Sequence, residues 1–261
     1  MTGLIALVGG HEHQPGSEPI HRRLMAEVGV ARPIVVVLLA ATTPGCRAFK
    51  IKEAQRCWSR FGARVEFGFL GGADEAERAL LLLTDPDLVV LTGGRPWRLD
   101  ARLMGPVLDR VLALWRAGMP LAASSAGAMA LCAWRLSIQR HRLPRVVAGF
   151  GLVPAVGMAP HFDRFGITYW SRLVARRHPE LQVIGLSDCT ALVGRDRIYQ
   201  VLGAGRCVVL RHNARNEYTA GEQLWLDGMG VPTLASDQLP AHVPALSGSD
   251  MGLSEIGLDL A

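Results

Sequence analysis

Paired cysteines are absent from this sequence, because its five cysteines lie far apart and none belongs to a Cys-x-x-Cys motif. This spacing excludes a disulfide framework and a zinc knot and predicts no metal site, and it is typical of reduced thiols. The first residues lack the positive charges of a secretory signal, and the apolar stretch at residues 4–8 is too short for one. We therefore expect a cytoplasmic protein.

Long hydrophobic runs are also lacking, apart from one uncharged stretch of 18 residues at positions 117–134. That stretch is rich in alanine, serine and glycine and contains Pro120, which suits a buried strand-turn-helix better than a membrane span. Lysine is nearly absent as well, so the net charge of +5 comes almost wholly from arginines that are scattered among acidic residues. Without a membrane span or a basic block, neither a membrane nor a nucleic acid is an expected partner.

Short apolar runs alternate with helical patterns through the first half of the chain. Five runs resemble strands buried on both faces: residues 4–8, 34–40, 65–69, 88–91 and 120–124. Buried runs of this kind, separated by amphipathic segments, predict parallel strands joined by helices. We expect an α/β fold with a doubly wound, mostly parallel sheet and helices on both faces.

The last third of the chain has a different pattern. It contains a helical segment around residues 168–177 and shorter strand-like runs at residues 182–186, 191–193, 198–202 and 207–210. We expect these strands to extend one sheet at its edge, partly antiparallel. From about Pro232 the sequence is rich in proline, serine, glycine and aspartate without any period. We therefore expect a single domain over residues 1–231 and a loosely ordered tail over residues 232–261.

The segment at residues 120–130 joins an apolar run to a serine and a series of very small residues. This pattern predicts a nucleophile elbow, in which a strand turns sharply into a helix with Ser125 at the tip. Ala123, Ala126 and Gly127 are small enough for the close approach of strand and helix that such a turn requires. The match to G-x-S-x-G is imperfect because Ala123 replaces the first glycine, and a simple helix cap at Ser124 or Ser125 is the structural alternative.

A serine nucleophile needs a base, an acid to orient that base, and backbone donors for the oxyanion. Of the eight histidines, His161 is the candidate base because it follows an apolar segment at a predicted loop, whereas His11 and His13 are expected at the surface. No acidic residue lies between Ser125 and His161, which excludes the Ser, acid, His order of α/β-hydrolases. Asp188, just after a predicted strand, is the best-placed acid.

The oxyanion donors are expected from two turns. Gly93 and Gly94 directly follow a predicted strand, and Ala126 follows the candidate nucleophile. Strand ends of an open α/β sheet share one crevice, so the amides of these three residues can face Ser125. An ordinary turn is the equally simple explanation of the glycine pair.

With these residues assembled, the chain resembles peptidase family S51, the dipeptidase E and cyanophycinase family. Four motifs occur in the family's order: Thr-Gly-Gly-Arg-Pro-Trp-Arg-Leu at residues 92–99, Ala-Ser-Ser-Ala-Gly-Ala at 123–128, Pro-His-Phe-Asp-Arg at 160–164, and Gly-Leu-Ser-Asp-Cys-Thr-Ala at 185–191. The resemblance implies a class I glutamine amidotransferase-like fold with Ser125 as nucleophile, His161 as base and Asp188 as acid. It also implies hydrolysis of a peptide or amide bond through an acyl-enzyme, without a cofactor, in a protein that is often a homodimer.

Several positions depart from the family pattern. Ala159 and Pro160 replace an Asp-Gln pair, and Phe165 and Ile167 replace arginines. Arg95 and Arg164, which lie within the matching motifs, are the remaining candidates for substrate binding, and a solvent-facing side chain is the alternative for Arg95.

Two other functions stay open at this level. A non-catalytic protein of the same fold that binds a small ligand or a protein partner would explain the departures from the motifs. A glutamine amidotransferase would need cysteine at the elbow, and Cys132 is expected too far along the helix to replace Ser125.

Overall fold

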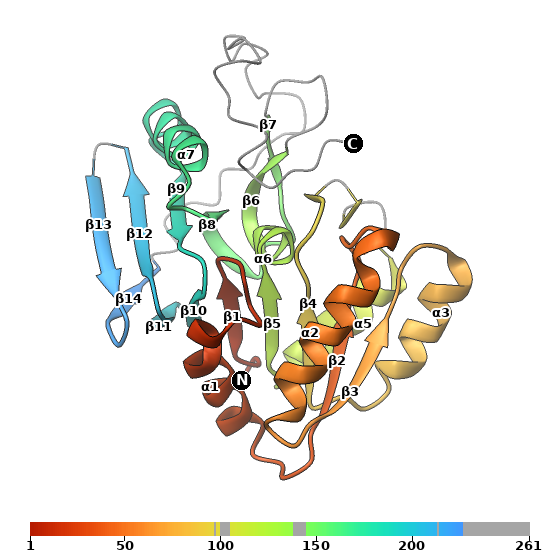
Figure 1. The fold of residues 1–261 in the computed structure, drawn as a ribbon. Helices are drawn as coiled ribbons and strands as arrows, with labels where there is room; N and C mark the ends of the chain where they lie inside the picture. The colour runs from red at the N-terminus through yellow and green to blue at the C-terminus, as the bar shows by residue number, and fades with distance from the viewer. Residues whose placement is uncertain (97, 100–104, 138–144, 213, 227–261) are drawn as a thin grey trace.

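The structure is a computed structural model, and it describes residues 1–96, 98–99, 105–137, 145–212 and 214–226. Figure 1 shows two sheets with helices packed around them. The helices are α1 (Glu18–Val28), α2 (Arg47–Ser59), α3 (Ala73–Leu82), α5 (Pro106–Arg116), α6 (Ala126–Leu131) and α7 (Phe165–Arg177), with 3-10 turns at Pro15–Ser17 and Pro44–Cys46.

The first sheet has eight strands in the order β14-β11-β10-β1-β5-β4-β2-β3. Their bounds are β1 (Ile5–Val8), β2 (Ile34–Leu38), β3 (Arg64–Gly68), β4 (Leu88–Leu91), β5 (Leu121–Ser124), β10 (Thr190–Arg195), β11 (Ile198–Gly203) and β14 (Gln223–Trp225). The strands from the first half of the chain are parallel to one another, and β10, β11 and β14 extend the sheet in antiparallel pairing. The α/β fold with a parallel sheet is confirmed.

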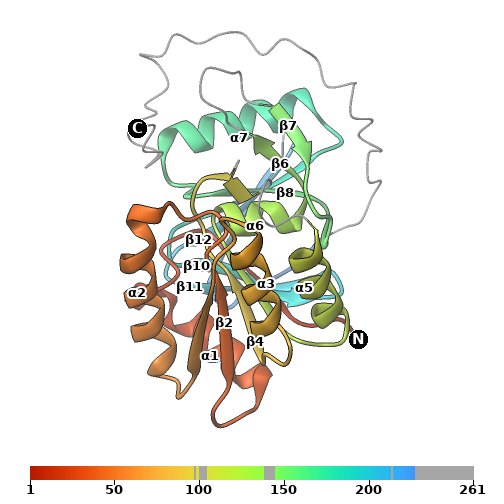
Figure 2. The same cartoon turned by 90° about the vertical axis from the view of Figure 1, so that its right-hand side faces the viewer.

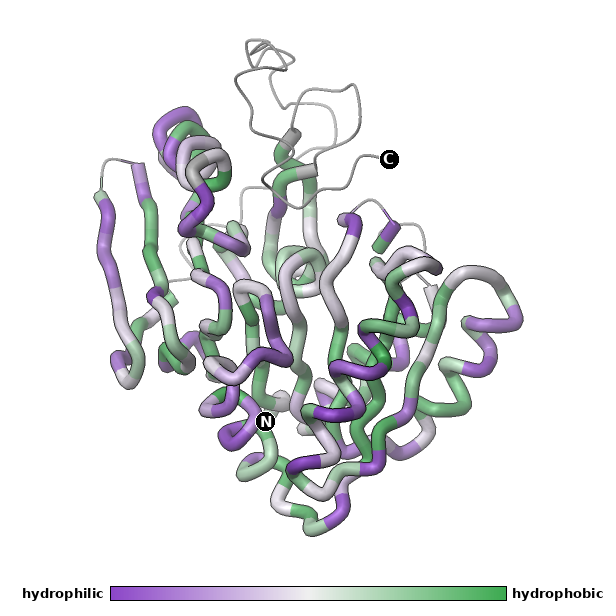
Figure 3. Tube along the Cα trace, in the orientation of Figure 1, coloured by the Kyte–Doolittle hydropathy of each residue, from purple (hydrophilic) through white to green (hydrophobic). Residues whose placement is uncertain are grey.

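Helices cover both faces of this sheet. Side chains of β1 alternate between two apolar clusters: Ala6 and Val8 pack with α1 and α2, whereas Ile5 and Leu7 pack with α3, α5 and α6. A strand with two buried faces must be apolar at every position, which is why the parallel strands read as continuous runs in the sequence. Figure 3 shows the complementary pattern in α1, α2 and α3, where hydrophilic residues alternate with apolar ones.

A second sheet was not expected from the sequence. It has six strands in the order β13-β12-β9-β8-β6-β7, with bounds β6 (Cys132–Ser137), β7 (Arg145–Ala148), β8 (Val153–Pro160), β9 (Gln182–Leu186), β12 (Arg206–Arg211) and β13 (Ala214–Thr219). The predicted strands at residues 182–186 and 207–210 exist, but they belong to this sheet and not to the edge of the first one. Figure 2 shows α7, β6, β7 and β8 above the first sheet and its helices. Frequent glycine and proline had hidden β7 and β8 in the sequence.

The elbow helix is also shorter than the sequence suggested. α6 ends at Leu131, and Cys132 adopts extended backbone angles and begins β6. The Cys132 thiol is fully buried and donates a hydrogen bond to the carbonyl of Ala128, 3.5 Å away. The predicted tail at residues 232–261 lies outside the described residues. Among the described residues, no helix combines the length and the apolar character that crossing a membrane requires.

Candidate active site

The chain makes a strained turn at Ser125, between the end of β5 and the start of α6. Its φ of 49° and ψ of −115° lie outside the regions that L-residues favour, and such strain persists where the surrounding structure holds it. The Ser125 amide donates to the carbonyl of Val8 at 2.9 Å, and the Ser125 carbonyl accepts from the amide of Met129 at 2.9 Å. These two bonds hold the strained turn between β5 and α6 in place.

The residues around the turn at Ser125 are small because strand and helix approach each other closely there. A Cβ atom on Gly127 would lie 2.7 Å from the carbonyl oxygen of Leu91 at the end of β4. Ala126 and Ala128 are buried in the core beside it. Helix α6 can therefore approach the ends of β4 and β5 closely only with residues of this size.

His161 lies within hydrogen-bond distance of both Ser125 and Asp188, one on each ring nitrogen. The Ser125 Oγ is 3.2 Å from His161 Nε2, and His161 Nδ1 is 2.5 Å from Asp188 Oδ1. The three residues follow the carboxyl ends of β5, β8 and β9, so strands of both sheets contribute to the site. The arrangement can transfer a proton from the hydroxyl to an imidazole whose other nitrogen is held by a carboxylate.

A glycine pair after β1 supports this arrangement and was not singled out in the sequence. The His161 amide donates to the Gly9 carbonyl, and the Cys189 amide donates to the Gly10 carbonyl, both at 2.9 Å. Gly10 has a φ of 144°, and a Cβ atom there would lie 2.2 Å from His161 Cε1 and 2.5 Å from Asp188 Oδ1. The signal available in the sequence was two glycines directly after a buried strand, the same signal that marked Gly93 and Gly94.

Burial lowers the pKa of His161, because the charged imidazolium loses hydration. The charge of Asp188 and its hydrogen bond act in the opposite direction, while the positive charges of Arg164 and His11 lower the pKa further. The net shift is downward, so His161 is neutral near pH 7. A neutral imidazole is the form that can accept the Ser125 proton.

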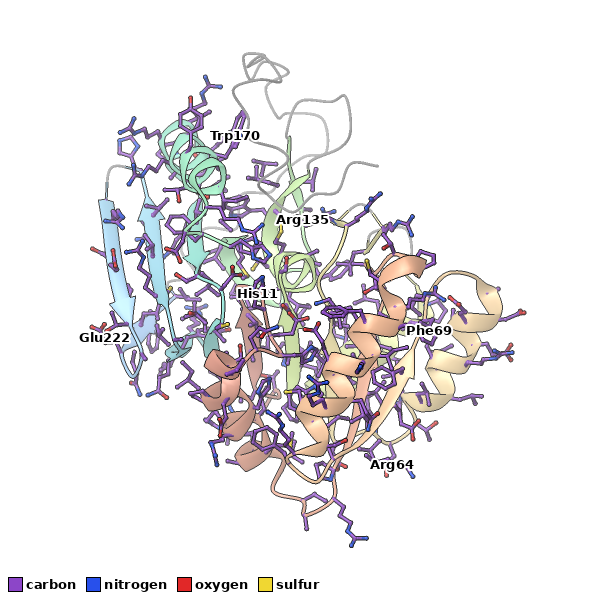
Figure 4. The ribbon with its side chains drawn as sticks, in the orientation of Figure 1. His11, Arg64, Phe69, Arg135, Trp170 and Glu222 are labelled. Carbon is purple, nitrogen blue, oxygen red and sulfur yellow. The ribbon has the colours of Figure 1, made fainter. Side chains whose placement is uncertain are left out.

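His11 lies at the open side of the site, although the sequence gave it no role. Its side chain is 52% exposed, as expected of a surface residue, but its Nε2 is 3.9 Å from Asp188 Oδ2. The rings of His11 and His161 have centroids 6.0 Å apart and meet edge to face. Figure 4 shows His11 near the centre of the view, on the loop that follows β1.

A second carboxylate, Glu12, lies behind the elbow. Its Oε2 accepts a hydrogen bond of 2.8 Å from the hydroxyl of Ser124, the residue next to Ser125. Burial alone would raise the pKa of Glu12, but Lys50, His13 and the hydrogen bonds to the carboxylate lower it overall. Contrary to the sequence prediction, His13 is not a surface residue, because its imidazole is largely buried beside Glu12.

Two of the three predicted oxyanion residues, Gly93 and Ala126, lie next to Ser125. A Cβ atom on Gly93 would be 2.8 Å from the Ser125 Cβ, so the backbone at Gly93 lies directly against Ser125. Ala126 is the first residue of α6, and an amide at that position has no acceptor within its helix. Gly94 lies against Ala41 instead, since a Cβ there would approach the Ala41 carbonyl oxygen to 2.3 Å.

The two candidate substrate-binding arginines are placed differently. Arg164 precedes α7, its amide donates to the His161 carbonyl at 3.0 Å, and its charge acts on the pKa of His161. Arg95 follows the glycine pair and is anchored by its amide to the Ala41 carbonyl at 3.0 Å. Asp163, the acid closest to His161 in sequence, instead pairs with Arg206 at 2.9 Å on the surface.

Comparisons with known proteins agree with this architecture. The sequence model of Peptidase family S51 matches residues 4–202. The crystal structure of a peptidase from an acI-B1 Actinobacterium is similar with a TM-score of 0.74 and 25% identity, covering 87% of this chain and 98% of that one. A protein from Listeria monocytogenes EGD-e assigned as a peptidase E is similar in fold, with a TM-score of 0.58 and 15% identity, over 78% of this chain and 100% of that one. No curated protein matches the sequence. From the match over most of its length, the chain belongs to peptidase family S51.

Proposed function

We propose that this protein is a serine peptidase or amidohydrolase that cleaves a small peptide or an isopeptide-like amide through an acyl-enzyme on Ser125. The observation that carries the proposal is the Ser125 hydroxyl at 3.2 Å from His161 Nε2, with Asp188 on the other ring nitrogen at 2.5 Å. An activated serine requires such a chain of hydrogen bonds, from the serine hydroxyl through the histidine ring to a carboxylate.

In the first step, the Ser125 Oγ attacks the carbonyl carbon of the scissile amide while its proton moves to His161 Nε2. Asp188 keeps the Nδ1–H tautomer in place and stabilises the imidazolium that forms. The backbone amides of Ala126 and Gly93 or Gly94 donate to the developing oxyanion. His161 then gives the proton to the leaving amine, which departs and leaves an ester on Ser125.

In the second step, water takes the place of the amine. His161 removes a proton from the water, the resulting hydroxide attacks the ester carbonyl, and Ser125 leaves with the proton from His161. Every proton in this cycle is carried by His161, and the proposed mechanism uses only side chains and amides of this chain.

Arg164 and Arg95 are the groups we assign to the substrate. Arg164 precedes α7, directly after the turn that carries His161, and its charge acts on His161, so a substrate carboxylate near the scissile bond would lie close to its positive charge. Arg95 lies two residues after Gly93, the glycine whose backbone lies against Ser125. A short peptide with a free or side-chain carboxylate is the substrate class that these positions favour.

The nucleophile is tested with a fluorophosphonate probe and a dipeptide panel that includes aspartyl and β-aspartyl peptides. The wild type should be labelled and should hydrolyse at least one peptide, whereas Ser125→Ala should do neither. His161→Ala should lose nearly as much rate, because members of such a group act as a unit. Both variants should keep the thermal stability of the wild type within a few degrees.

Absence of labelling in a folded wild type would favour the non-catalytic alternative, a protein that binds a small ligand or a partner. Equal rates in the wild type and Ser125→Ala would remove the mechanism. The expected homodimer is tested on the same preparations by light scattering, and the cytoplasmic location by fractionation of cells.

A further inference from the structure

His11 has no part in the proposed reaction, yet it lies beside His161, the proposed base, and Asp188, the acid that orients this base. Its Nε2 faces the Asp188 oxygen that does not bind His161, at 3.9 Å. One ligand atom from each of His11, His161 and Asp188 lies within 4.8 Å of the other two. Two imidazoles and one carboxylate are a donor set that binds Zn²⁺, with a water as fourth ligand.

The backbone holds these three side chains together before any ion arrives. His11 and His161 both have a φ of 53°, a left-handed conformation that a residue other than glycine adopts only when its surroundings impose it. Gly9 and Gly10, which precede His11, accept hydrogen bonds from the amides of His161 and Cys189. The three turns are therefore linked directly to one another.

The site is also open to an ion from solvent. The side chains of His11, Asp188 and His161 are 52%, 34% and 19% exposed, so each of the three is accessible to solvent. Ligand atoms of a tetrahedral zinc ion are about 3.4 Å apart, given metal–ligand distances of about 2.1 Å. Rotation of the exposed His11 ring and a small separation of Asp188 from His161 reach that spacing.

We propose that His11, His161 and Asp188 bind Zn²⁺ at an inhibitory site that competes with the catalytic arrangement. Zinc on His161 Nδ1 replaces the proton that this nitrogen shares with Asp188, so the ring keeps its proton on Nε2 instead. The neutral ring changes tautomer without net gain or loss of protons. With a hydrogen on Nε2, His161 cannot accept the proton of Ser125, and the enzyme is inactive until the ion dissociates.

Binding is tested on full-length Ser125→Ala, which keeps all three ligands and needs no turnover, by calorimetric titration with zinc. One ion per chain should bind, and His11→Asn should weaken binding at least tenfold. Asparagine is chosen because it tolerates the left-handed backbone of His11 and lacks an imidazole. His178→Ala, which removes an imidazole paired with Glu180, and Cys46→Ser, which removes an exposed thiol, are the matched controls and should bind zinc unchanged.

The inhibitory consequence depends on the proposed function and is measured separately. Zinc should inhibit hydrolysis by the wild type, and EDTA should restore the rate. His11→Asn should need at least tenfold more zinc to lose half of the rate that it has without zinc. Zinc binding without any hydrolysis would support the site and contradict the proposed function. Equal zinc affinity in His11→Asn and its parent, with both folded by circular dichroism, would overturn the site.

Discussion

Two carboxylates flank the elbow, and their surroundings give them different tasks. Asp188 is one-third exposed and faces His161 on the open side, whereas Glu12 is buried and binds the hydroxyl of Ser124 from behind. They thus act on neighbouring residues of one turn, Ser125 through His161 and Ser124 directly. The comparison teaches that an acid on the open side can serve chemistry, while a buried acid with fixed partners serves to hold the turn.

The environment of Glu12 supports this division. Lys50 Nζ lies 3.8 Å from its Oε1, and the positive partner offsets part of the cost of burying the carboxylate. The Glu12 carboxylate binds the hydroxyl of Ser124 and faces the ammonium group of Lys50. Its effect on the nucleophile therefore passes through the backbone between residues 124 and 125.

Replacing Asp188 should give the largest effect on catalysis. Asp188→Asn removes the negative charge that holds the Nδ1–H tautomer, and kcat/KM should fall on the order of 10,000-fold. The thermal midpoint should change little, because the residue is partly exposed. Steady-state kinetics, with a peptide that the wild type cleaves in the dipeptide panel, and a thermal melt measure both quantities. A fall of less than tenfold would mean that Asp188 does not orient His161.

Placing a methyl group at Gly10 should come next. Gly10→Ala drives a Cβ against the His161 ring and the Asp188 carboxylate, so we expect a loss of kcat/KM of roughly 100-fold or more. Gly29→Ala is the matched control, since Gly29 also has a positive φ, of 66°, but has no atom within 4 Å of the added Cβ. Kinetics and melts of both variants separate the steric effect at the site from backbone strain. Equal losses in the two would assign the effect to strain alone.

Neutralising Glu12 should affect stability more than chemistry. Glu12→Gln keeps an acceptor for Ser124 but loses the charge that Lys50 faces, and we expect a loss of about 1–3 kcal/mol in the free energy of unfolding. The rate of the folded fraction should fall less than tenfold. Denaturant unfolding and kinetics below the transition measure the two effects.

Glu53→Gln is the control for the Glu12 variant, because Glu53 also faces Lys50, at 3.6 Å, without contacting Ser124. It should cost less stability than Glu12→Gln. A drop in kcat/KM for Glu12→Gln as large as that for Asp188→Asn would end the distinction between the two carboxylates.

The pH dependence should show the smallest effect. Burial lowers the pKa of His161, and the base works only when neutral, so kcat/KM should rise with pH through a midpoint below the ordinary value of 6.5. Asp188, Arg164 and His11 are the charged or titratable neighbours that act most strongly on this pKa. The midpoint should therefore be the same in the wild type and Glu12→Gln. Rate profiles between pH 4 and 8 test this, and a midpoint above 6.5 in the wild type would contradict the lowered pKa.

Most of the first sheet could be predicted from the sequence, because a parallel strand buried on both faces must be apolar along its whole length. The elbow at Ser125 was visible for a similar reason: a tight strand-to-helix turn excludes large residues, and residues 126–128 are small. His161 and Asp188 could be selected because each follows an apolar run. The second sheet could not be predicted, since β7 and β8 contain or adjoin glycine and proline and resemble loops.

Local rules thus determined where the chain is buried and where it must turn, and those rules were sufficient to select Ser125, His161 and Asp188. Only the tertiary structure decided which residues stand next to them. Gly10, His11 and Glu12 precede Ser125 by more than a hundred positions, and they reach the site because β1 pairs with β5 and so delivers its following loop to the same edge. Strand pairing at that distance has no counterpart in local sequence, which is why these neighbours were found only in the fold.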